Sequence, residues 1–284
     1  MKRIDLFTGE TGDVQYDIFT FPDGEKHIKF TEELDRKEKY TVACRIRNAE
    51  ELFILVQVGD ILNRMEVVWD LRILYLMSMR MDRVINFNEA FSLKTVANII
   101  NSLKPFTVGI ATPHSDRTLK LIDSSFSFGD SEINNYLGDK SEKLIICAPD
   151  KGAYDRYWLY IEGRPNLTVR KKRDLSNGRI LSLEVEEKNY TDEDIKDADI
   201  LVLDDLCDGG GTFVLCAQKL RELFPDNRLI LYVTHMVNPK GLENVLKVYD
   251  EVHITNTYEN YKPEEYSAEK KLFVHNLALP CRTT

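Results

Sequence analysis

Short hydrophobic runs recur along the chain from about residue 50 to the end. Each run is four or five residues long and lacks the polar alternation of a half-exposed strand, which is typical of strands buried on both faces of a parallel sheet. The sequence therefore predicts strands at residues 52–56, 73–76, 108–111, 144–147, 200–203 and 229–233.

Helical patterns lie between these runs. Residues 91–103 and 212–224 each place hydrophobic side chains three or four positions apart, which predicts two amphipathic helices, and Pro225 ends the second. The alternation of strands and helices predicts an α/β protein with mainly parallel sheets flanked by helices.

The pattern weakens once, at residues 125–138, where serine and glycine interrupt it. A chain of 284 residues is long enough for one large or two ordinary domains. We therefore expect two domains, at residues 1–130 and 131–284.

Charge and composition exclude several classes of protein. Lys and Arg total 38 against 47 Asp and Glu, so the net charge is −9 and a nucleic-acid partner bound by bulk charge is not expected. The five cysteines contain no Cys-x-x-Cys pair, which argues against a disulfide framework or a zinc site. No apolar run approaches the roughly 18 residues of a membrane span, so we expect a cytoplasmic protein with reduced thiols and no membrane partner.

The strongest chemical signal follows the predicted strand at 200–203. Two carboxylates stand at the strand end, and a third precedes three glycines and a threonine that opens a helix. Such a turn gathers backbone N–H groups at a helix N-terminus and forms a cup for phosphate, while the paired acids can accept hydrogen bonds from sugar hydroxyls, directly or through hydrated Mg²⁺. The alternative is an ordinary turn with solvated acids. The residues concerned are Asp204, Asp205, Asp208, Gly209, Gly210, Gly211 and Thr212.

A second signal is a local excess of positive charge. Residues 164–179 contain six cations and a single acid, Asp174, in a chain that is otherwise acidic. Mobile cations of this kind stabilise the charge that develops when a phosphoryl group is transferred, and Ser176-Asn177-Gly178 favours a flexible loop. The alternative is a solvated cationic hairpin.

Two predicted strands end in a proline followed by a polar residue, at Pro113-His114 and Pro149-Asp150. Ligands of open α/β sheets bind at the carboxyl ends of strands, so these residues are candidate walls of a site. Arg80 and Arg83 follow another strand, in a position suited to a triphosphate. Each of these side chains could instead be an ordinary packed or surface residue, as we expect of the other four histidines.

The segment at 200–212 resembles the ribose-phosphate loop of type I phosphoribosyltransferases and, more fully, that of ribose-phosphate diphosphokinases (phosphoribosyl pyrophosphate synthetases). Further segments resemble the latter family in the same order along nearly the whole chain. They are Phe21-Pro22-Asp23-Gly24-Glu25, Met79-Arg80-Met81-Asp82-Arg83, Pro113-His114-Ser115-Asp116, Pro149-Asp150-Lys151-Gly152 and Lys171-Lys172-Arg173.

The resemblance implies two phosphoribosyltransferase-like domains and transfer of the β,γ-diphosphoryl group of Mg-ATP to the C1 hydroxyl of a ribose 5-phosphoryl acceptor, with release of AMP. It implies that Lys171 and Arg173 are catalytic, that His114 and Asp150 position Mg²⁺, and that a homodimer or larger homo-oligomer completes the site. The residues implied to contact ATP are Phe21, Asp23, Glu25, Arg80, Asp82, Arg83 and His114. The residues implied to bind the ribose phosphate are Asp204, Asp205, Asp208, Gly209, Gly210, Gly211 and Thr212.

Three positions depart from the family pattern. Met81 stands where the family usually has Gln, Thr112 stands where Asp is common, and Asp208-Gly209-Gly210-Gly211-Thr212 replaces Asp-Thr-Ala-Gly-Thr. The loss of the Thr and Ala side chains is expected to open space for an acceptor larger than ribose 5-phosphate. We therefore favour ADP-ribose slightly, as in the similar phage-type enzymes that make ADP-ribose pyrophosphate for rebuilding NAD.

Two other functions remain open at this point. A phosphoribosyltransferase would use the same phosphate loop to consume an activated sugar, but it would have no use for the segments at 21–25 and 171–173. A non-catalytic regulatory homologue is the other alternative, if Met81 and Thr112 weaken the ATP or metal site.

Overall fold

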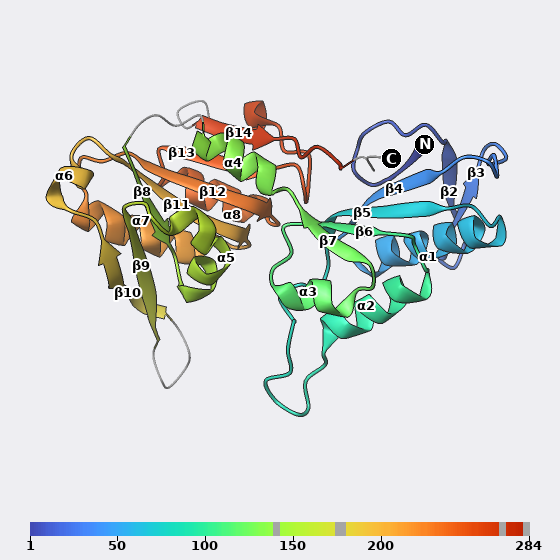
Figure 1. The fold of residues 1–284 in the computed structure, drawn as a ribbon, viewed down its shortest axis with the longest axis horizontal. Helices are drawn as coiled ribbons and strands as arrows, with labels where there is room; N and C mark the ends of the chain where they lie inside the picture. Colours follow the sequence, from blue (N-terminus) through green and yellow to red (C-terminus); the bar gives the residue numbers. More distant parts are fainter. Residues whose placement is uncertain (139–142, 174–179, 267–270, 281–284) are drawn as a thin grey trace. The chain divides into compact units, whose positions relative to one another are not determined.

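The chain forms two compact units in a computed structural model that describes residues 1–138, 143–173, 180–266 and 271–280 (Figure 1). Unit 1 consists of Met1–Ser131 and Leu277–Thr284, and unit 2 consists of Glu132–Asn276. The sequence analysis assigns residues 277–284 to the second domain, whereas the structure groups them with the first unit. The reason is local packing, because the side chain of Leu277 is 4% exposed against the sheet of unit 1.

Unit 1 contains a five-stranded sheet in the order β1-β4-β5-β6-β7, in which every neighbouring pair is parallel. Its strands are β1 (Lys2–Leu6), β4 (Tyr40–Ile46), β5 (Trp69–Leu76), β6 (Val108–Ala111) and β7 (Ser125–Phe128). Three helices follow strands of this sheet: α1 (Ala49–Arg64), α2 (Ser92–Ser102) and α3 (Asp116–Leu121). The strands expected at 73–76 and 108–111 are confirmed.

The hydrophobic run at residues 52–56 is part of α1, so the strand predicted there is wrong. Asn48 caps the helix by accepting a hydrogen bond from the backbone N–H of Glu51, and two acids occupy the first turn. Leu52, Leu55 and Val58 then recur at helical spacing and are buried in the core of unit 1. A short apolar run looks the same in a buried helix and a buried strand, and the cap decides between them.

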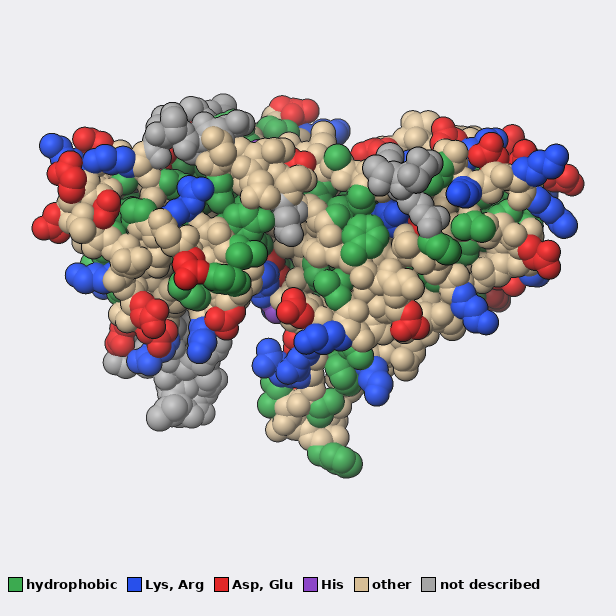
Figure 2. Space-filling view, viewed as in Figure 1, with side chains coloured by type: hydrophobic (Ala, Val, Ile, Leu, Met, Phe, Trp, Pro, Cys, Tyr) green, Lys and Arg blue, Asp and Glu red, His purple; other side chains and the backbone are tan. Residues whose placement is uncertain are grey.

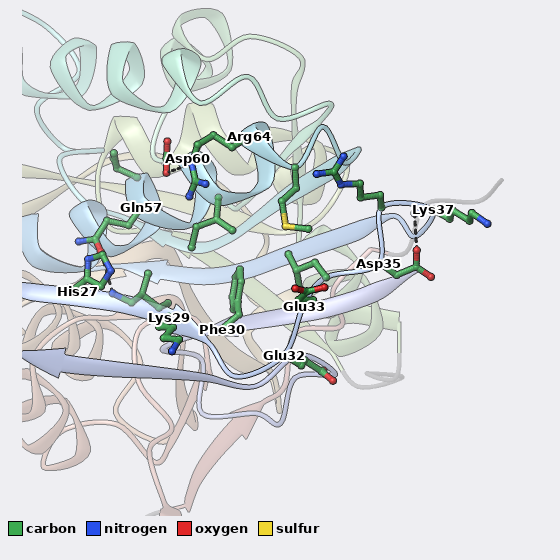
Figure 3. A pocket seen from close by; sticks show the side chains of 16 residues that line it. His27, Lys29, Phe30, Glu32, Glu33, Asp35, Lys37, Gln57, Asp60 and Arg64 are labelled. Carbon is green, nitrogen blue, oxygen red and sulfur yellow. Dashed lines mark hydrogen bonds and ion pairs between the residues drawn. The ribbon is translucent and has the colours of Figure 1, made fainter.

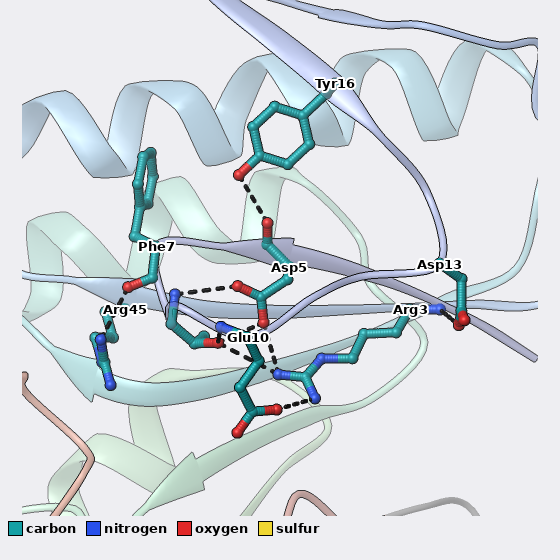
Figure 4. A network of polar contacts seen from close by, with 8 residues as sticks. Arg3, Asp5, Phe7, Glu10, Asp13, Tyr16 and Arg45 are labelled. Atoms are coloured by element: carbon teal, nitrogen blue, oxygen red, sulfur yellow. Dashed lines mark hydrogen bonds and ion pairs between the residues drawn. The ribbon is translucent and has the colours of Figure 1, made fainter. Parts of the chain in front are cut away.

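An antiparallel hairpin of β2 (Tyr16–Thr20) and β3 (Lys26–Phe30) projects from unit 1. A polar network orders the turn that leads into it (Figure 4). The carboxylate of Asp5 accepts a hydrogen bond from Arg3 at 2.6 Å, and its backbone carbonyl accepts one from the hydroxyl of Tyr16 at 2.7 Å. The buried Arg45 donates to the carbonyl of Phe7 at 3.1 Å.

The two faces of the sheet in unit 1 are covered differently. Ile73 and Ile110 point into the core formed with α1 and α2. Leu74 and Ala111, one position further along each strand, point to the opposite face, since side chains alternate along a strand. There they pack with Leu277 of the C-terminal segment, and the guanidinium of Arg72 donates to the carbonyl of Pro280 at 3.2 Å.

Unit 2 contains a seven-stranded sheet in the order β10-β9-β8-β11-β12-β13-β14. All neighbouring strands are parallel except β9 and β10, which form an antiparallel hairpin. The strands are β8 (Leu144–Ala148), β9 (Asn166–Arg173), β10 (Ile180–Asn189), β11 (Asp199–Cys207), β12 (Leu229–Met236), β13 (Glu251–Thr255) and β14 (Lys271–His275). The strands expected at 144–147, 200–203 and 229–233 are confirmed.

Helices cover both faces of this second sheet (Figure 1). Ile145 and Val202 face the core that includes α7 (Gly211–Leu223) and α8 (Pro239–Leu246). Ile146 and Leu203 face the core that includes α4 (Asp130–Gly138) and α5 (Lys151–Ile161). Two shorter helices, α6 (Asp192–Ile195) and η1 (Pro263–Glu265), complete the described part of the unit. The burial of both faces explains why these strands are continuously hydrophobic.

The structure also describes four of the five cysteines and the length of the helices. Cys44, Cys147, Cys207 and Cys216 are buried free thiols, and Cys281 lies outside the described residues. None of the helices in the described ranges is long and apolar enough to cross a membrane.

Candidate active site

The paired carboxylates predicted to bind ribose lie at the carboxyl end of β11 in unit 2. Their side chains are 14% exposed in Asp204 and 2% exposed in Asp205. A single guanidinium nitrogen, Nη1 of Arg156 on α5, lies 3.0 Å from Asp204 Oδ1 and 2.8 Å from Asp205 Oδ1. The sequence analysis did not identify Arg156. The signal that could have found it is its position six residues after Asp150, in the segment that follows the predicted strand at 144–147.

The charges of these three groups are strongly coupled. Burial and the neighbouring charge of Asp205 raise the pKa of Asp204, and Arg156 opposes this effect. Burial alone would lower the pKa of Arg156, but Asp205 and Asp204 raise it above its usual value. The negative charge of Asp150 also acts on both Asp204 and Arg156, so the predicted Pro-Asp segment lies near the acid pair.

The glycine-rich turn after β11 leads directly into α7, as predicted. Gly210 is the N-cap residue and has φ of +78°, a left-handed conformation that favours glycine. Asp208, Gly209 and Gly211 are exposed at this end of the helix. The first backbone N–H groups of a helix have no intrahelical partner, so the turn provides donors for a phosphate.

The structure corrects the expectation that both departures from the family loop open space. A Cβ built on Gly209 would meet no atom within 4 Å, so this position is open. A Cβ on Gly210 would lie 3.0 Å from the backbone oxygen of Gly241 and 3.3 Å from a methyl group of Val245. The extra space is therefore confined to Gly209.

Helix α8 packs against the glycine turn and supports it. A Cβ on Gly241 would lie 1.7 Å from the backbone oxygen of Asp208, so only glycine permits this close packing. Asn244 donates to the backbone oxygen of Gly209 at 3.1 Å, and Asn238 donates to a carboxylate oxygen of Asp208 at 3.3 Å. These three residues of the α8 segment were missed in the sequence, because nothing local indicates which turn they contact.

Asp150, a predicted Mg²⁺ ligand, lies at the start of α5. Its Oδ1 accepts a hydrogen bond from the backbone N–H of Ala153 at 3.0 Å and caps the helix. In the described ranges, no three His, Cys, Asp or Glu side chains form a metal cluster. Mg²⁺ usually takes one or two carboxylates together with substrate phosphates, so the carboxylate oxygens of Asp150 and Asp204 are chemically suitable donors.

In unit 1, the predicted ATP residues follow the tips of β5 and β6. Ser78 after β5 and Thr112 after β6 both have positive φ, of +67° and +36°. Left-handed backbone at two neighbouring strand ends turns the chain sharply just before Arg80 and His114. His114 lies between Thr112 and the first turn of α3, and its side chain is partly exposed.

Asp82 connects these two segments rather than facing solvent. It is 4% exposed, and its carboxylate accepts a hydrogen bond from Arg83 at 3.1 Å. Its backbone oxygen accepts one from Arg117 of α3 at 3.3 Å. Burial alone would raise the pKa of Asp82, but the neighbouring Ser115 and Arg83 outweigh it and lower the pKa below its usual value. Asp82 thus holds the 80–83 and 114–117 segments together.

The connection between β5 and α2 exposes hydrophobic side chains beside these cations. Ile85 is 79% exposed and Phe87 is fully exposed, in a turn closed by hydrogen bonds from Asn86 to Glu89. Figure 2 shows a hydrophobic tip at the place where Figure 1 draws this connection, with Lys and Arg side chains gathered above it.

The predicted adenine loop forms the tip of the β2–β3 hairpin. Phe21, Asp23 and Glu25 are exposed, and the tip is closed by a hydrogen bond from the Phe21 N–H to the Glu25 carbonyl at 2.8 Å. The ring of Phe21 lies edge-on to that of Phe19, with centroids 5.1 Å apart, and His27 lies beside both. The hairpin therefore presents an exposed aromatic cluster.

A groove of about 890 Å³ lies between β3, the residues after it and the outer face of α1 (Figure 3). Gln57 of α1 fixes the hairpin at its edge by accepting from Ile28 N–H at 3.0 Å and donating to the Lys26 carbonyl at 2.9 Å. Phe30 lies inside the groove, and charged residues of both signs surround it. None of the predicted site residues lines this groove.

The predicted catalytic residues Lys171 and Arg173 lie at the end of β9, where they pair with Leu183 and Ile180 of β10. The backbone is thus part of an antiparallel hairpin. The side chains of both residues lie outside the described part of the chain, as do residues 174–179.

Within each unit, the structure brings part of the predicted site together. In unit 1, Asp82 contacts both Arg83 and Arg117 of the segment that begins with His114. In unit 2, the acid pair, the glycine turn and Asp150 lie at neighbouring strand and helix ends. The roles of the individual residues stay predictions.

Comparison with known proteins gives a consistent result. No family model matches the chain. Curated ribose-phosphate pyrophosphokinases are similar to most of it: the one from Pyrococcus furiosus is 29% identical over 253 residues, covering 85% of each chain. The one from Pyrococcus abyssi is 28% identical over 257 residues, covering 86% of this chain and 84% of the relative. The one from Mycoplasma genitalium is 25% identical over 274 residues, covering 91% and 79%.

A solved structure shows the same fold. The crystal structure of phosphoribosylpyrophosphate synthetase from Mycobacterium smegmatis matches 93% of this chain and 86% of that chain, with a TM-score of 0.76 at 19% identity. This match confirms the α/β class with parallel sheets flanked by helices. The chain is thus similar over most of its length to curated ribose-phosphate pyrophosphokinases, and it has the fold of the synthetase.

Proposed function

We propose that the protein transfers the β,γ-diphosphoryl group of Mg-ATP to the C1 hydroxyl of a ribose 5-phosphoryl acceptor and releases AMP. Its similarity to curated pyrophosphokinases over most of the chain makes it an enzyme of this transferase type. The observation that carries the proposal is the end of β11, where Asp204 and Asp205 precede the exposed glycine turn of α7.

The acceptor would bind along this segment of unit 2. The backbone N–H groups at the start of α7 would hold the 5-phosphate, where the partial positive charge of the helix N-terminus favours an anion. The carboxylates of Asp204 and Asp205 would accept hydrogen bonds from the ribose hydroxyls. Together these contacts fix both ends of the sugar and so orient its C1 hydroxyl for attack.

ATP would be held mainly by cations and by the hairpin tip. Arg80, Arg83 and His114 would contact the triphosphate, with Asp82 fixing the orientation of Arg83. The aromatic cluster around Phe21 would pack against the adenine, with Asp23 and Glu25 at its edge. The exposed tip is available to a neighbouring subunit, and we propose that a homo-oligomer completes the site.

The reaction spreads negative charge over the transferred group and the AMP leaving oxygen. Lys171 and Arg173 would stabilise this charge as it develops, because cations placed where charge appears only in the transition state accelerate the chemical step. When bound, Mg²⁺ would neutralise phosphate charge, and Asp150 and His114 would hold it with the ATP oxygens. Replacing Lys171 by Ala is expected to abolish AMP formation while acceptor binding persists.

We favour ADP-ribose as the acceptor over ribose 5-phosphate. The support is the open space at Gly209, which leaves room for a phosphate that continues into a larger group. The names of the relatives favour ribose 5-phosphate instead. The two acceptors differ only beyond the 5-phosphate, so the remainder of the mechanism is the same for both.

The test is to incubate the protein with ATP, Mg²⁺ and either ribose 5-phosphate or ADP-ribose, and to measure AMP and the phosphorylated sugar by chromatography and ³¹P NMR. We expect AMP and a 1-diphosphorylated product. AMP from one acceptor only identifies that acceptor. No AMP with either acceptor would contradict the proposal, and consumption of an activated sugar with a free base would indicate a phosphoribosyltransferase instead.

A further inference from the structure

We propose that Arg156 is a positioning residue of the acceptor site, which holds Asp204 and Asp205 as a fixed pair of acceptors for the ribose hydroxyls. This inference rests on the proposed function. It adds a residue whose side chain would act on the sugar through two others.

The geometry is the first support. Consecutive side chains of an extended strand point to opposite faces, yet one nitrogen of Arg156 lies within 3.0 Å of both carboxylates. The guanidinium therefore brings together two side chains that the strand itself would direct apart. The backbone N–H of Asp205 also donates to Asp204 Oδ1 at 2.8 Å, which limits the rotation of that carboxylate.

The exposure of the two acids divides their roles. Asp205 is 2% exposed and forms the buried anchor of the ion pair. Asp204 is 14% exposed, so it is the more accessible acceptor of the pair. An Arg side chain that is itself only 17% exposed offers a rigid, planar contact to both.

Charge is the second support. Two adjacent buried carboxylates repel each other, and without a cation one of them would take up a proton or turn away. Arg156 offsets part of this repulsion, because its positive charge lies within 3.0 Å of both carboxylates. The negative charge of Asp150 acts on both Asp204 and Arg156.

Local features of α5 position the side chain of Arg156. Asp150 caps α5 six residues before Arg156. Tyr157, the next residue after Arg156, leaves the helical conformation with φ of −107° and ψ of 16°, and its side chain is buried. The helix is therefore irregular immediately after the residue whose guanidinium reaches the acid pair.

The experiment compares Arg156→Lys and Arg156→Ala with the unchanged protein by steady-state kinetics. We expect the Ala variant to raise the KM for the acceptor by more than about tenfold, because it leaves buried charges unpaired. The Lys variant keeps the charge but not the planar contact and is expected to fall between the two. The KM for ATP is expected to stay within about twofold, since Arg156 acts on the acceptor.

A second substrate tests the mechanism directly. The 2-deoxy analogue of the acceptor lacks one hydroxyl that the acid pair would contact. The Ala variant is therefore expected to raise the KM for the analogue much less than the KM for the acceptor. A merely structural role would raise both by the same factor.

Arg221→Ala is the matched control. Arg221 is an ion-paired arginine near the end of α7, bonded to Asp250, and it lies outside the predicted site. We expect this loss of an ion pair to lower the melting temperature without changing the KM for the acceptor. Titration calorimetry with the acceptor alone extends the comparison to the unreacted complex.

The outcomes are distinguishable. If the unchanged protein forms no AMP with either acceptor, the proposed function fails. If it does form AMP and the Lys and Ala variants leave the acceptor KM unchanged, or raise the KM for acceptor and 2-deoxy analogue equally, the role of Arg156 is refuted. Should Arg156→Ala not fold, the same comparison with Arg156→Lys decides.

Discussion

The two neighbouring residues Gly209 and Gly210 show how differently glycine acts in one turn. Gly210 adopts φ of +78° and packs against α8, so glycine is required there by conformation and by space. Gly209 meets nothing within 4 Å, so any requirement for glycine comes from what enters the site. The sequence alone could not separate these reasons, because the packing of Gly210 involves a helix about 30 residues further along the chain.

Gly209→Thr tests the role of the open space. The side chain has room in the folded protein, so we expect unchanged stability and a shift of acceptor preference towards ribose 5-phosphate. The measurement is the ratio of kcat/KM for the two acceptors. An unchanged ratio would show that the acceptor does not extend past Gly209.

Gly210→Ala is its structural counterpart. A left-handed residue with a Cβ costs about 1–2 kcal/mol, and the added carbon would contact Gly241 as well. We expect the free energy of unfolding to fall by at least this amount in chemical denaturation. Gly209→Ala is the control, and equal losses in the two variants would contradict the difference in their surroundings.

Asp82→Asn tests the residue that joins the segments at 80–83 and 114–117. The pKa of Asp82 is lowered in the folded protein, so its stabilising contribution is complete above the usual value of about 3.9 and is lost as the pH falls through the folded-state pKa. Because Arg83 is largely exposed, we expect a loss on the order of 1 kcal/mol at pH 7. Denaturation curves at pH 7 and pH 3 measure this difference, and a loss that does not shrink at low pH would refute it.

At the scale of elements, local pattern was enough for most of the fold. The strands at 73–76, 108–111, 144–147, 200–203 and 229–233 are continuous hydrophobic runs that lie where predicted. The run at 52–56 is helical because Asn48 caps a longer segment whose apolar positions recur every three or four residues. Local pattern predicted residues of the candidate site only where they directly follow a hydrophobic strand.

Side chains that act across elements could not be predicted from local pattern. Arg156 of α5 contacts the end of β11, and Asn244 of α8 contacts the glycine turn. Both contacts depend on the order of strands in the sheet, which places β8 and β12 on the two sides of β11. A short sequence segment carries no information about this order.

Gly241→Ala tests the support that α8 gives to the glycine turn. A Cβ at this position would overlap the backbone oxygen of Asp208, so the turn must move although alanine favours the helix itself. We expect the acceptor KM to rise by about tenfold or more, as for a lost charged hydrogen bond. Glu243→Ala, an exposed change on the same helix, is the control, and equal KM values in the two variants would exclude the turn from acceptor binding.

At the scale of the whole molecule, the C-terminal segment contributes to the stability of unit 1. Leu277 packs with Leu74, Ala111 and Phe128 on the face of the sheet opposite α1 and α2. Leu277→Ala is expected to lower the free energy of unfolding of this unit by about 2–5 kcal/mol, as large-to-small changes in a core do. Leu223→Ala, a half-exposed change in unit 2, serves as the control in the same thermal melts. Equal losses would mean that the segment is not a true part of the core.

The return of the chain after residue 276 also has a consequence for protein engineering. Residues 1–131 and 277–280 belong to one unit, and a Cβ built on Gly129 would come within 2.9 Å of the Leu277 side chain, so the chain leaves and re-enters this unit at adjacent positions. Unit 2 is therefore inserted into the sequence of unit 1. Such domain insertions are commonly tolerated where the two connection points lie close together. A short glycine bridge from 131 to 277 is therefore expected to remove unit 2 and leave unit 1 as one continuous chain.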